Sequence, residues 1–287
     1  MRVLVNGVRL FFDVEGAGLT PSGSTLRPKP TLIVMHGGPG SDHSSFKPWF
    51  GRFADIAQVV YIDHRGNGRS DDGPPESQTL AQWGDDIVGF CEALEIERPI
   101  VYGLSFGGFV AQSVAIRHPD LPSKLILAST ACRSVFERKY EAFESMGGPE
   151  ARRAAERFWG GAIDKDPAVI REWDRHCLPH YNTRPQDPQM RARAIRRDAT
   201  AARFFKADGE RWRMDFRADL AKVRCPTLVL AGDRDPVTPL ADSEEIVASL
   251  PKDLVRYQVV HGAGHGVHRD RPAEAERILR AFILGKP

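Results

Sequence analysis

The sequence predicts an α/β fold in which a mostly parallel central sheet carries helices on both faces and one inserted helical segment. The first observation is a regular alternation of short apolar runs with helix-like segments between residues 31 and 128. The second is the interruption of this alternation from about 131 to 222, and its return at 227–231 and 255–260. Because parallel strands need long crossover connections, usually helices, this order is typical of a parallel sheet.

Composition limits the classes of protein that fit this chain. Its 287 residues suffice for one large domain with an insertion, and 41% hydrophobic with 27% charged residues is ordinary for a soluble protein. A net charge of +2 without a dense basic run argues against nucleic acid, and no apolar run reaches membrane-spanning length. The four scattered cysteines predict neither a zinc site nor a disulfide framework. We expect a cytoplasmic protein without nucleic-acid or membrane partners, and oligomeric state is left open.

The N-terminal part of the chain predicts the first strands. Residues 2–14 alternate apolar and polar side chains around the turn dipeptide Asn6-Gly7 and predict a hairpin. Residues 15–30 are rich in Gly, Pro, Ser and Thr and predict a loop. The next expected elements are a buried strand at 31–35, a glycine-rich loop at 36–40 and a helix at 46–56.

The order of strand and helix then repeats. A strand at 59–62 runs into the polar loop 63–70, and a helix follows whose apolar residues share one face. These apolar residues are Leu80, Trp83, Ile87, Phe90, Cys91 and Leu94. The remaining core elements are strands at 99–102, 125–128, 227–231 and 255–260, a helix at 108–118 and a last helix at 273–284.

The interrupted stretch predicts a helical cap over the sheet. It carries helical runs rich in Arg, Glu and Ala at 136–146, 150–159, 167–175 and 189–205. We therefore expect residues 1–130 and 223–287 to form one core domain, and residues 131–222 to form the cap.

The motif Gly103-x-Ser105-x-Gly107 predicts a nucleophilic serine. By itself the motif is weak, but here an apolar strand precedes it and a helical pattern ending at Pro119 follows it. A tight turn between strand and helix holds the serine in a strained conformation, and side chains at the flanking positions would clash. The hydroxyl is then exposed at the edge of the sheet, beside the start of a helix.

A serine hydroxyl is a poor nucleophile at neutral pH, so a base and an acid are expected downstream in the chain. Asp233 and Asp235 both follow the strand at 227–231 and both qualify by position. Three histidines follow the strand at 255–260, namely His261, His265 and His268. We favour His265, because the flanking Gly264 and Gly266 leave the backbone free to turn the imidazole inward.

An enzyme of this kind also needs two N–H groups directed at the oxyanion of the reaction. The Phe106 N–H follows the serine, and the loop 36–40 supplies a second donor, which we assign to the Gly38 N–H. His36 is expected to brace this loop. A phosphate-binding interpretation of the glycines fails, since no Lys-Ser/Thr follows and no GxGxxG opens a helix.

These motifs together carry a resemblance to a known family. The chain resembles the α/β hydrolases, and His36-Gly37-Gly38-Pro39-Gly40 is similar to the signature of the proline iminopeptidase group of serine peptidases. The loop 63–70 is similar to that group's Asp-x-Arg-Gly-x-Gly-x-Ser. The family's Gly-x-x-Asp pattern matches 232–235 and selects Asp235, and its Gly-x-Gly-His pattern matches 262–265. The resemblance implies an α/β-hydrolase fold and an aminopeptidase acting on small unblocked N-terminal residues such as proline.

This sequence departs from the group where substrate is bound. Phe106 replaces the usual Trp, the cap stretch 178–182 lacks the Glu that binds a free α-amino group, and Pro236 follows the predicted acid. Candidate replacement carboxylates are Glu141, Glu144, Glu172 and Glu210. A proline-iminopeptidase-like enzyme is favoured, and a carboxylesterase, lactonase or amidase without free-amine recognition is the alternative. A slow-turnover ligand receptor on a hydrolase fold is an alternative of another class.

The expected chemistry is acyl transfer to Ser105, with His265 as base, Asp235 orienting it, and the Phe106 and Gly38 N–H groups binding the oxyanion. The expected partner is a small-molecule or short-peptide substrate. No metal ion or organic cofactor is expected.

Overall fold

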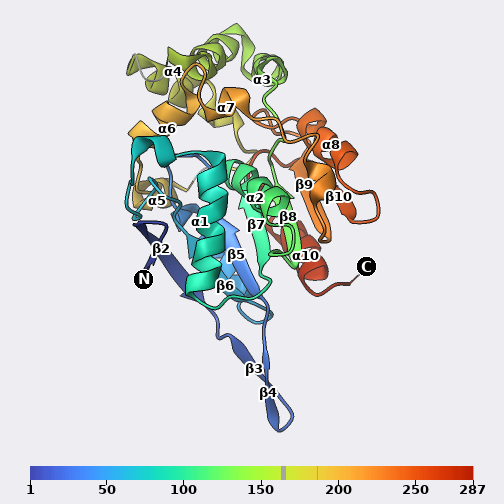
Figure 1. The fold of residues 1–287 in the computed structure, drawn as a ribbon. Coiled ribbons are helices and arrows are strands. Elements are labelled where there is room, and N and C mark those ends of the chain that lie inside the picture. The colour runs from blue at the N-terminus through green and yellow to red at the C-terminus, as the bar shows by residue number, and fades with distance from the viewer. Residues whose placement is uncertain (163–165, 186, 287) are drawn as a thin grey trace.

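A computed structural model describes residues 1–162, 166–185 and 187–286. Its centre is an eight-stranded sheet with the order β1-β2-β6-β5-β7-β8-β9-β10 (Figure 1). The β1–β2 and β2–β6 pairs are antiparallel, and every pair from β6 to β10 is parallel. The strands are β1 (Arg2–Val5), β2 (Val8–Glu15), β5 (Thr31–Met35), β6 (Gln58–Ile62), β7 (Ile100–Leu104), β8 (Lys124–Ala128), β9 (Thr227–Gly232) and β10 (Val255–Val260). The predicted fold class is confirmed.

The parallel strands β5 to β9 are buried on both faces, whereas the edge strand β10 exposes Arg256 and Gln258. Successive side chains of a strand point to opposite sides of the sheet. In β5, Ile33 and Met35 pack into one hydrophobic cluster and Leu32 and Val34 into the other. The first cluster includes side chains of α1 (Leu80–Ala93), α2 (Phe106–Arg117) and α8 (Leu240–Ser249), and the second includes those of α10 (Pro272–Ile283). The short helix α9 (Val267–Asp270) precedes α10. The core therefore forms two layers, one on each side of the sheet.

Residues 15–30 form a hairpin, so the prediction of a loop there was wrong. Strands β3 (Leu19–Ser22) and β4 (Thr25–Pro28) pair with each other in a separate two-stranded sheet. Gly23 supplies the left-handed backbone of the tight turn, with φ 62°. The hairpin is largely exposed and projects away from the rest of the molecule (Figure 1), which explains its polar composition.

The prediction of a helix at 46–56 was also wrong. The segment forms two short 3-10 turns, η1 (His43–Phe46) and η2 (Trp49–Phe53). Pro48 separates them, and proline has no N–H with which to continue a helix. The apolar side chains Phe46, Phe50 and Phe53 are nevertheless fully buried, so the hydrophobic pattern correctly indicated that this segment packs into the core.

Residues 131–222, which we call the helical insert, lie over the end of the sheet opposite the hairpin (Figure 1). The described part of this insert contains helices and an isolated bridge between Arg133 and Asp215, but no strand. Its elements are α3 (Phe136–Arg157), η4 (Phe158–Ala162), α4 (Ala168–His176), η5 (Leu178–His180), α5 (Pro188–Arg193), α6 (Asp198–Phe205), α7 (Glu210–Arg213) and η6 (Leu220–Lys222). The described residues contain one further 3-10 turn, η3 (Pro75–Ser77).

Two predicted helical runs of the insert have different bounds in the structure. The runs 136–146 and 150–159 belong largely to one element, α3, which bends at Gly148 with φ 73°. The run 189–205 is divided into α5 and α6, because the linker between them is bonded to the core. The Ile195 N–H donates to Asp42 (3.1 Å) and the Arg197 N–H donates to the Gly40 carbonyl (2.9 Å). Among the described residues, no helix has the length and apolar character to cross a bilayer.

Candidate active site

Ser105 occupies the sharp turn between β7 and α2, with φ 54° and ψ −114°. A non-glycine residue with positive φ is strained, and such strain collects at functional sites. A Cβ at Gly103 would collide with the backbone of Gly107, and a Cβ at Gly107 would collide with the Met35 carbonyl group. The two flanking glycines are therefore required by close backbone approach, as the motif predicts.

The Phe106 N–H lies in the first turn of α2, where N–H groups have no intrahelical acceptor. Gly37 faces Ser105 from the neighbouring loop, since a Cβ at Gly37 would lie 3.5 Å from the serine Cβ. Gly38 has φ 124°, a conformation that favours glycine. Gly37, Gly38 and Ser105 line the same cavity, so the loop 36–40 and the start of α2 are brought together as predicted.

Buried polar side chains hold the loop 36–40 in place. The Gly40 N–H donates to Asn67 Oδ1 at 2.6 Å, which links the loop to the motif 63–70. The His36 ring is fully buried, its Nδ1 lies 2.7 Å from the Gly37 carbonyl, and its Nε2 accepts from the His64 N–H at 3.3 Å. Burial lowers the pKa of His36. His36 thus braces the loop, in agreement with the sequence-based expectation.

Asp235 follows β9 and is almost completely buried. Its Oδ1 accepts from the N–H groups of Val237 (2.8 Å) and Thr238 (3.0 Å), and its Oδ2 accepts from the Thr238 hydroxyl (2.7 Å). His265 Nδ1 lies 2.8 Å from the same Oδ2. Burial alone would raise the pKa of Asp235, but His265 and these donors outweigh it and hold the pKa below its ordinary value. Asp235 is therefore built to stay ionised beside the imidazole.

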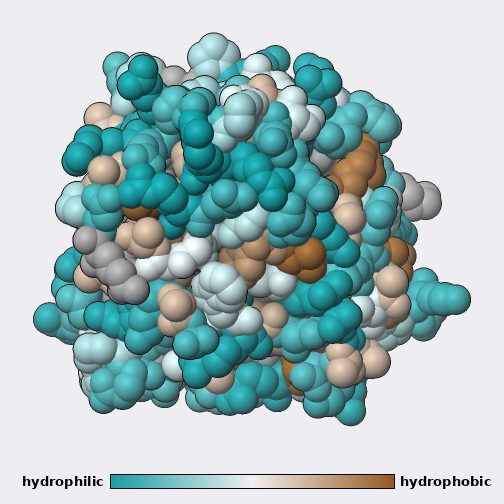
Figure 2. All heavy atoms as spheres, turned by 90° about the horizontal axis from the view of Figure 1, so that it is seen from above, coloured by the Kyte–Doolittle hydropathy of each residue, from teal (hydrophilic) through white to brown (hydrophobic). Residues whose placement is uncertain are grey.

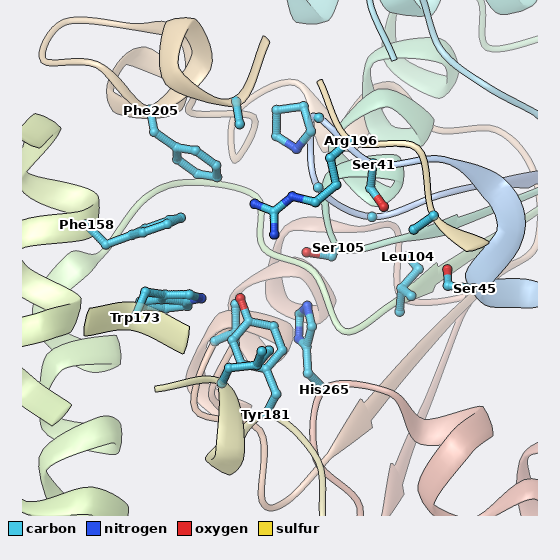
Figure 3. A pocket seen from close by; sticks show the side chains of 18 of the residues that line it. Ser41, Ser45, Leu104, Ser105, Phe158, Trp173, Tyr181, Arg196, Phe205 and His265 are labelled. Carbon is cyan, nitrogen blue, oxygen red and sulfur yellow. The ribbon is translucent and has the colours of Figure 1, made fainter. Parts of the chain in front are cut away.

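The helical insert positions His265. The His265 N–H donates to the Tyr181 carbonyl at 2.7 Å, and the Tyr181 ring packs edge-on against the imidazole with 5.2 Å between ring centroids. The next residue, Asn182, accepts from the Gly266 N–H at 2.8 Å. With Nδ1 directed at Asp235, the other ring nitrogen is left for the cavity, which Ser105 and His265 both line (Figure 3). Among the hydrogen bonds of the described residues, none joins Ser105 Oγ to His265.

The competing acid and histidines have different surroundings. Asp233 accepts from the Gly262 N–H at 2.6 Å and pairs with His261 at 2.9 Å, and the His261 side chain is 85% exposed. His268 also lines the cavity, but its ring packs among Phe46, Trp49 and Phe50. Of the three histidines, His265 is the one bonded to Asp235.

A cavity of about 600 Å³ lies between the sheet edge and the helical insert. Figure 3 shows Ser105 and His265 facing a set of aromatic side chains from the insert, namely Phe158, Trp173, Tyr181 and Phe205. The outer surface above this region is mostly hydrophilic, with small separate hydrophobic areas (Figure 2). The large apolar surface of the insert is thus directed inward, where it can bind an apolar part of a small molecule.

The four glutamates proposed as amine ligands lie outside the cavity lining. Glu144 pairs with Arg152 at 3.0 Å, and Glu172 pairs with Arg157. Glu210 accepts from the Leu80 N–H at 2.9 Å and so caps α1, whereas Glu141 is exposed on α3. Because three of these carboxylates already have partners and the fourth faces solvent, the structure brings none of them to Ser105.

Other charged residues do line the cavity. The carboxylates are Asp174, 2.5 Å from Arg191, and Asp198, 3.3 Å from Arg196. The Arg196 guanidinium points into the cavity (Figure 3). The lining cations besides Arg196 are Lys139, Arg191, Arg211 and Arg269. Cations therefore outnumber carboxylates in the lining, a property that depends on how the helices of the insert are oriented. Within 1–162, 166–185 and 187–286, no group of three or more His, Cys, Asp and Glu side chains is arranged to hold a metal ion.

The mostly parallel sheet and the serine-bearing turn after β7 define the class of protein, an α/β hydrolase architecture. The sequence pattern of the family described as the alpha/beta hydrolase fold matches residues 30–272, and the chain belongs to this family.

Relatives with different printed activities are similar to this chain. A putative carbamate hydrolase, RutD, from Caulobacter sp. is 27% identical over 273 residues, covering 88% of this chain and 95% of the relative. The proline iminopeptidase PfmaB from Pestalotiopsis fici is 27% identical, covering 95% and 98%. The crystal structure of proline iminopeptidase from Mycobacterium smegmatis has a TM-score of 0.79 at 24% identity, covering 99% and 97%, and this likeness shows the fold alone.

Proposed function

We propose that the protein is a cofactor-independent serine hydrolase that cleaves an ester or amide bond of a small substrate through an acyl-enzyme. The observation that carries the proposal is the buried Asp235–His265 pair, which lines one cavity with the strained Ser105. We also propose a cytoplasmic location, because the four buried cysteines of the protein are all unpaired, as is usual in a reducing compartment.

In the proposed reaction, His265 removes the Ser105 proton as the serine oxygen attacks the carbonyl carbon. Asp235 keeps the imidazole in one orientation and stabilises its cation. The Phe106 and Gly38 N–H groups bind the tetrahedral oxyanion. His265 then protonates the leaving group, and water, activated by the same imidazole, releases the acyl group and the free serine.

We further propose that residues 131–222 form a cap that selects the substrate, since this segment supplies the aromatic wall opposite Ser105. Charge in the cavity favours an esterase, lactonase or amidase over an aminopeptidase. An aminopeptidase needs a carboxylate for the substrate ammonium, and both lining carboxylates already pair with arginines. This preference reverses the one drawn from sequence resemblance.

The aminopeptidase is the second candidate, because the relative named proline iminopeptidase PfmaB matches nearly the whole chain. Asp174 would then have to exchange Arg191 for the substrate ammonium. Free and N-acetylated proline and alanine arylamides, assayed beside p-nitrophenyl esters, separate the two candidates. At least a ~10²-fold loss of kcat/KM on N-acetylation supports the aminopeptidase, and turnover of esters alone supports the other enzyme class.

Replacement of the nucleophile tests the hydrolase itself. Ser105→Ala is expected to lower kcat by at least ~10³-fold and to abolish labelling by a fluorophosphonate. Ser113→Ala, a buried serine further along α2, is the matched control and should stay within about threefold of wild type. Full activity of Ser105→Ala would reject the nucleophile. Labelling of Ser105 without multiple turnover on any ester would favour the slow-turnover receptor.

A further inference from the structure

Arg211 is a buried cation whose side chain makes no ion pair or hydrogen bond with the residues that the structure describes. It lies on α7, only 3% exposed, and it lines the cavity. Its Nη1 is buried and makes no hydrogen bond among the described residues. The guanidinium stacks over the Phe109 ring, 4.5 Å from the centroid, which fixes its orientation. A buried guanidinium is normally paired with a carboxylate, so an unpaired one beside a cavity indicates an external anion.

The carboxylate near Arg211 already has other cationic partners, so positive charge is in excess around Arg211. Asp242 is the carboxylate whose charge acts on Arg211, but Asp242 already accepts from Lys139 Nζ at 2.7 Å and from Arg138 at 2.9 Å. Lys139 is itself fully buried and lines the cavity. Burial lowers the pKa of Arg211 to about 10 and that of Lys139 to about 8, so Arg211 keeps its charge at neutral pH. An anion bound here would offset the repulsion between the two cations.

Arg211 and the proposed nucleophile line the same cavity. Phe109, which also lines it, lies in the first turn of α2, four residues after Ser105. A substrate in this cavity can therefore place one group at Arg211, over the Phe109 ring, and its reacting carbonyl at Ser105.

We propose that Arg211 binds a carboxylate of the substrate. The substrate is then an acyl compound that carries, a few atoms from the reacting carbonyl, an additional anionic group. This inference rests on the proposed function, because it places the anion relative to Ser105. Arginine suits this role, since its planar donors can bind a carboxylate in two places at once.

The three other lining arginines are weaker candidates. Arg191 already pairs with Asp174 at 2.5 Å. Arg196 pairs with Asp198 at 3.3 Å and its side chain is half exposed, so water screens its charge. Arg269 has a buried Nε without a partner among the described residues, but the residue is less buried than Arg211 and follows His265 by four positions. Arg269→Met is therefore included, because it distinguishes an anion site near His265 from the proposed anion site at Arg211.

The test uses matched esters with and without a terminal carboxylate. Mono-p-nitrophenyl esters of succinate, glutarate and adipate are compared with p-nitrophenyl butyrate. Wild type is expected to prefer at least one carboxylate ester by tenfold or more in kcat/KM. Arg211→Met should reduce this preference by ~30-fold or more, and Arg211→Lys by less. Arg213→Met, on the same helix but solvent-exposed and paired with Glu210, should leave the preference unchanged.

Binding of free dicarboxylates tests the same proposal independently of the ester preference. Free glutarate or adipate should raise the Tm of wild type and inhibit hydrolysis of the neutral ester, and both effects should be lost in Arg211→Met. Without ligand, Arg211→Met should melt no lower than wild type, because it removes an unpaired buried charge. If Arg211→Met does not fold, Arg211→Lys carries the comparison.

The failures of the two proposals look different. Hydrolysis of neutral and anionic esters at equal rates by wild type, with no effect of dicarboxylates, would overturn the anion site and leave the hydrolase intact. Loss of the preference in Arg269→Met but not in Arg211→Met would also overturn the assignment. No turnover of any ester or amide by wild type would instead overturn the proposed function.

Discussion

At the scale of single residues, the site depends on a few side chains whose partners determine their state. Asp235 accepts from Val237 and Thr238 as well as pairing with His265, so its charge and orientation are held before substrate arrives. Asp233, two positions earlier, bonds to the exposed His261. The two carboxylates therefore differ in contacts although they are equivalent by sequence position.

Replacement of each acid tests this difference. Asp235→Asn is expected to lower kcat by ~10³- to 10⁴-fold, because an amide neither stabilises an imidazolium nor fixes its tautomer. Asp233→Asn is the matched control, and we expect its kcat/KM within about threefold of wild type, since its partner is exposed and outside the cavity lining. Steady-state kinetics on any turned-over substrate measures both. The opposite ranking would move the acid by two positions.

At the scale of elements, the loops after the parallel strands build the site, and one hairpin lies apart from it. The loop after β5 is tied to the loop after β6 through the Gly40–Asn67 hydrogen bond, and the loop after β10 is tied to the insert through Tyr181. By contrast, β3 and β4 pair with each other and are largely exposed. The Lys29 N–H donates to the Gly18 carbonyl at 2.8 Å, so the two ends of the hairpin already meet.

Deletion of residues 19–28 is therefore expected to leave catalysis unchanged. A two-residue Gly-Ser connection can join Gly18 to Lys29, because a hydrogen bond already holds their backbones together. The Tm should shift by no more than about 3 °C, since little apolar surface is lost. Differential scanning calorimetry and ester kinetics measure both quantities. A large loss of kcat/KM with an unchanged Tm would show that the hairpin contributes to the site.

At the scale of the whole molecule, burial of ionisable groups makes stability depend on pH. His268 is packed among the aromatic side chains of η1 and η2, near Arg269, Asp270 and His265. Burial, with the charge of Arg269, lowers the pKa of His268 from 6.5 to about 4. The folded state thus prefers the neutral ring. The stability present above pH 6.5 is lost as the pH falls from 6.5 towards 4, because the unfolded chain binds the proton first.

The expected loss attributable to His268 is on the order of 3 kcal/mol between these pH values. His268→Phe keeps a ring in the aromatic cluster and removes the titration, so its Tm should fall less than that of wild type between pH 7.5 and 4.5. Thermal melts at the two pH values measure the difference. His261→Gln, which removes an exposed histidine, should retain the wild-type slope. Equal slopes for His268→Phe and wild type would contradict the assignment.

The sequence by itself determined the fold class and the candidates for catalysis. Alternating strand and helix patterns and the glycines around Ser105 are local features that restrict the backbone, and the chain order of Ser, Asp and His can be followed directly along the sequence. Two local patterns predicted the wrong element: Pro48 divides the helix-like run at 46–56, and the exposed hairpin β3–β4 has the composition of a loop.

Tertiary structure alone decided which charges face the cavity. Glu210 and Arg211 are adjacent in the sequence, yet Glu210 caps α1 while Arg211 is buried over Phe109. The four glutamates chosen from sequence are directed to other partners or to solvent, and Tyr181 reaches His265 across more than eighty positions of chain. Such contacts depend on how the insert docks on the sheet, and docking is set by packing between distant segments, which no local pattern encodes.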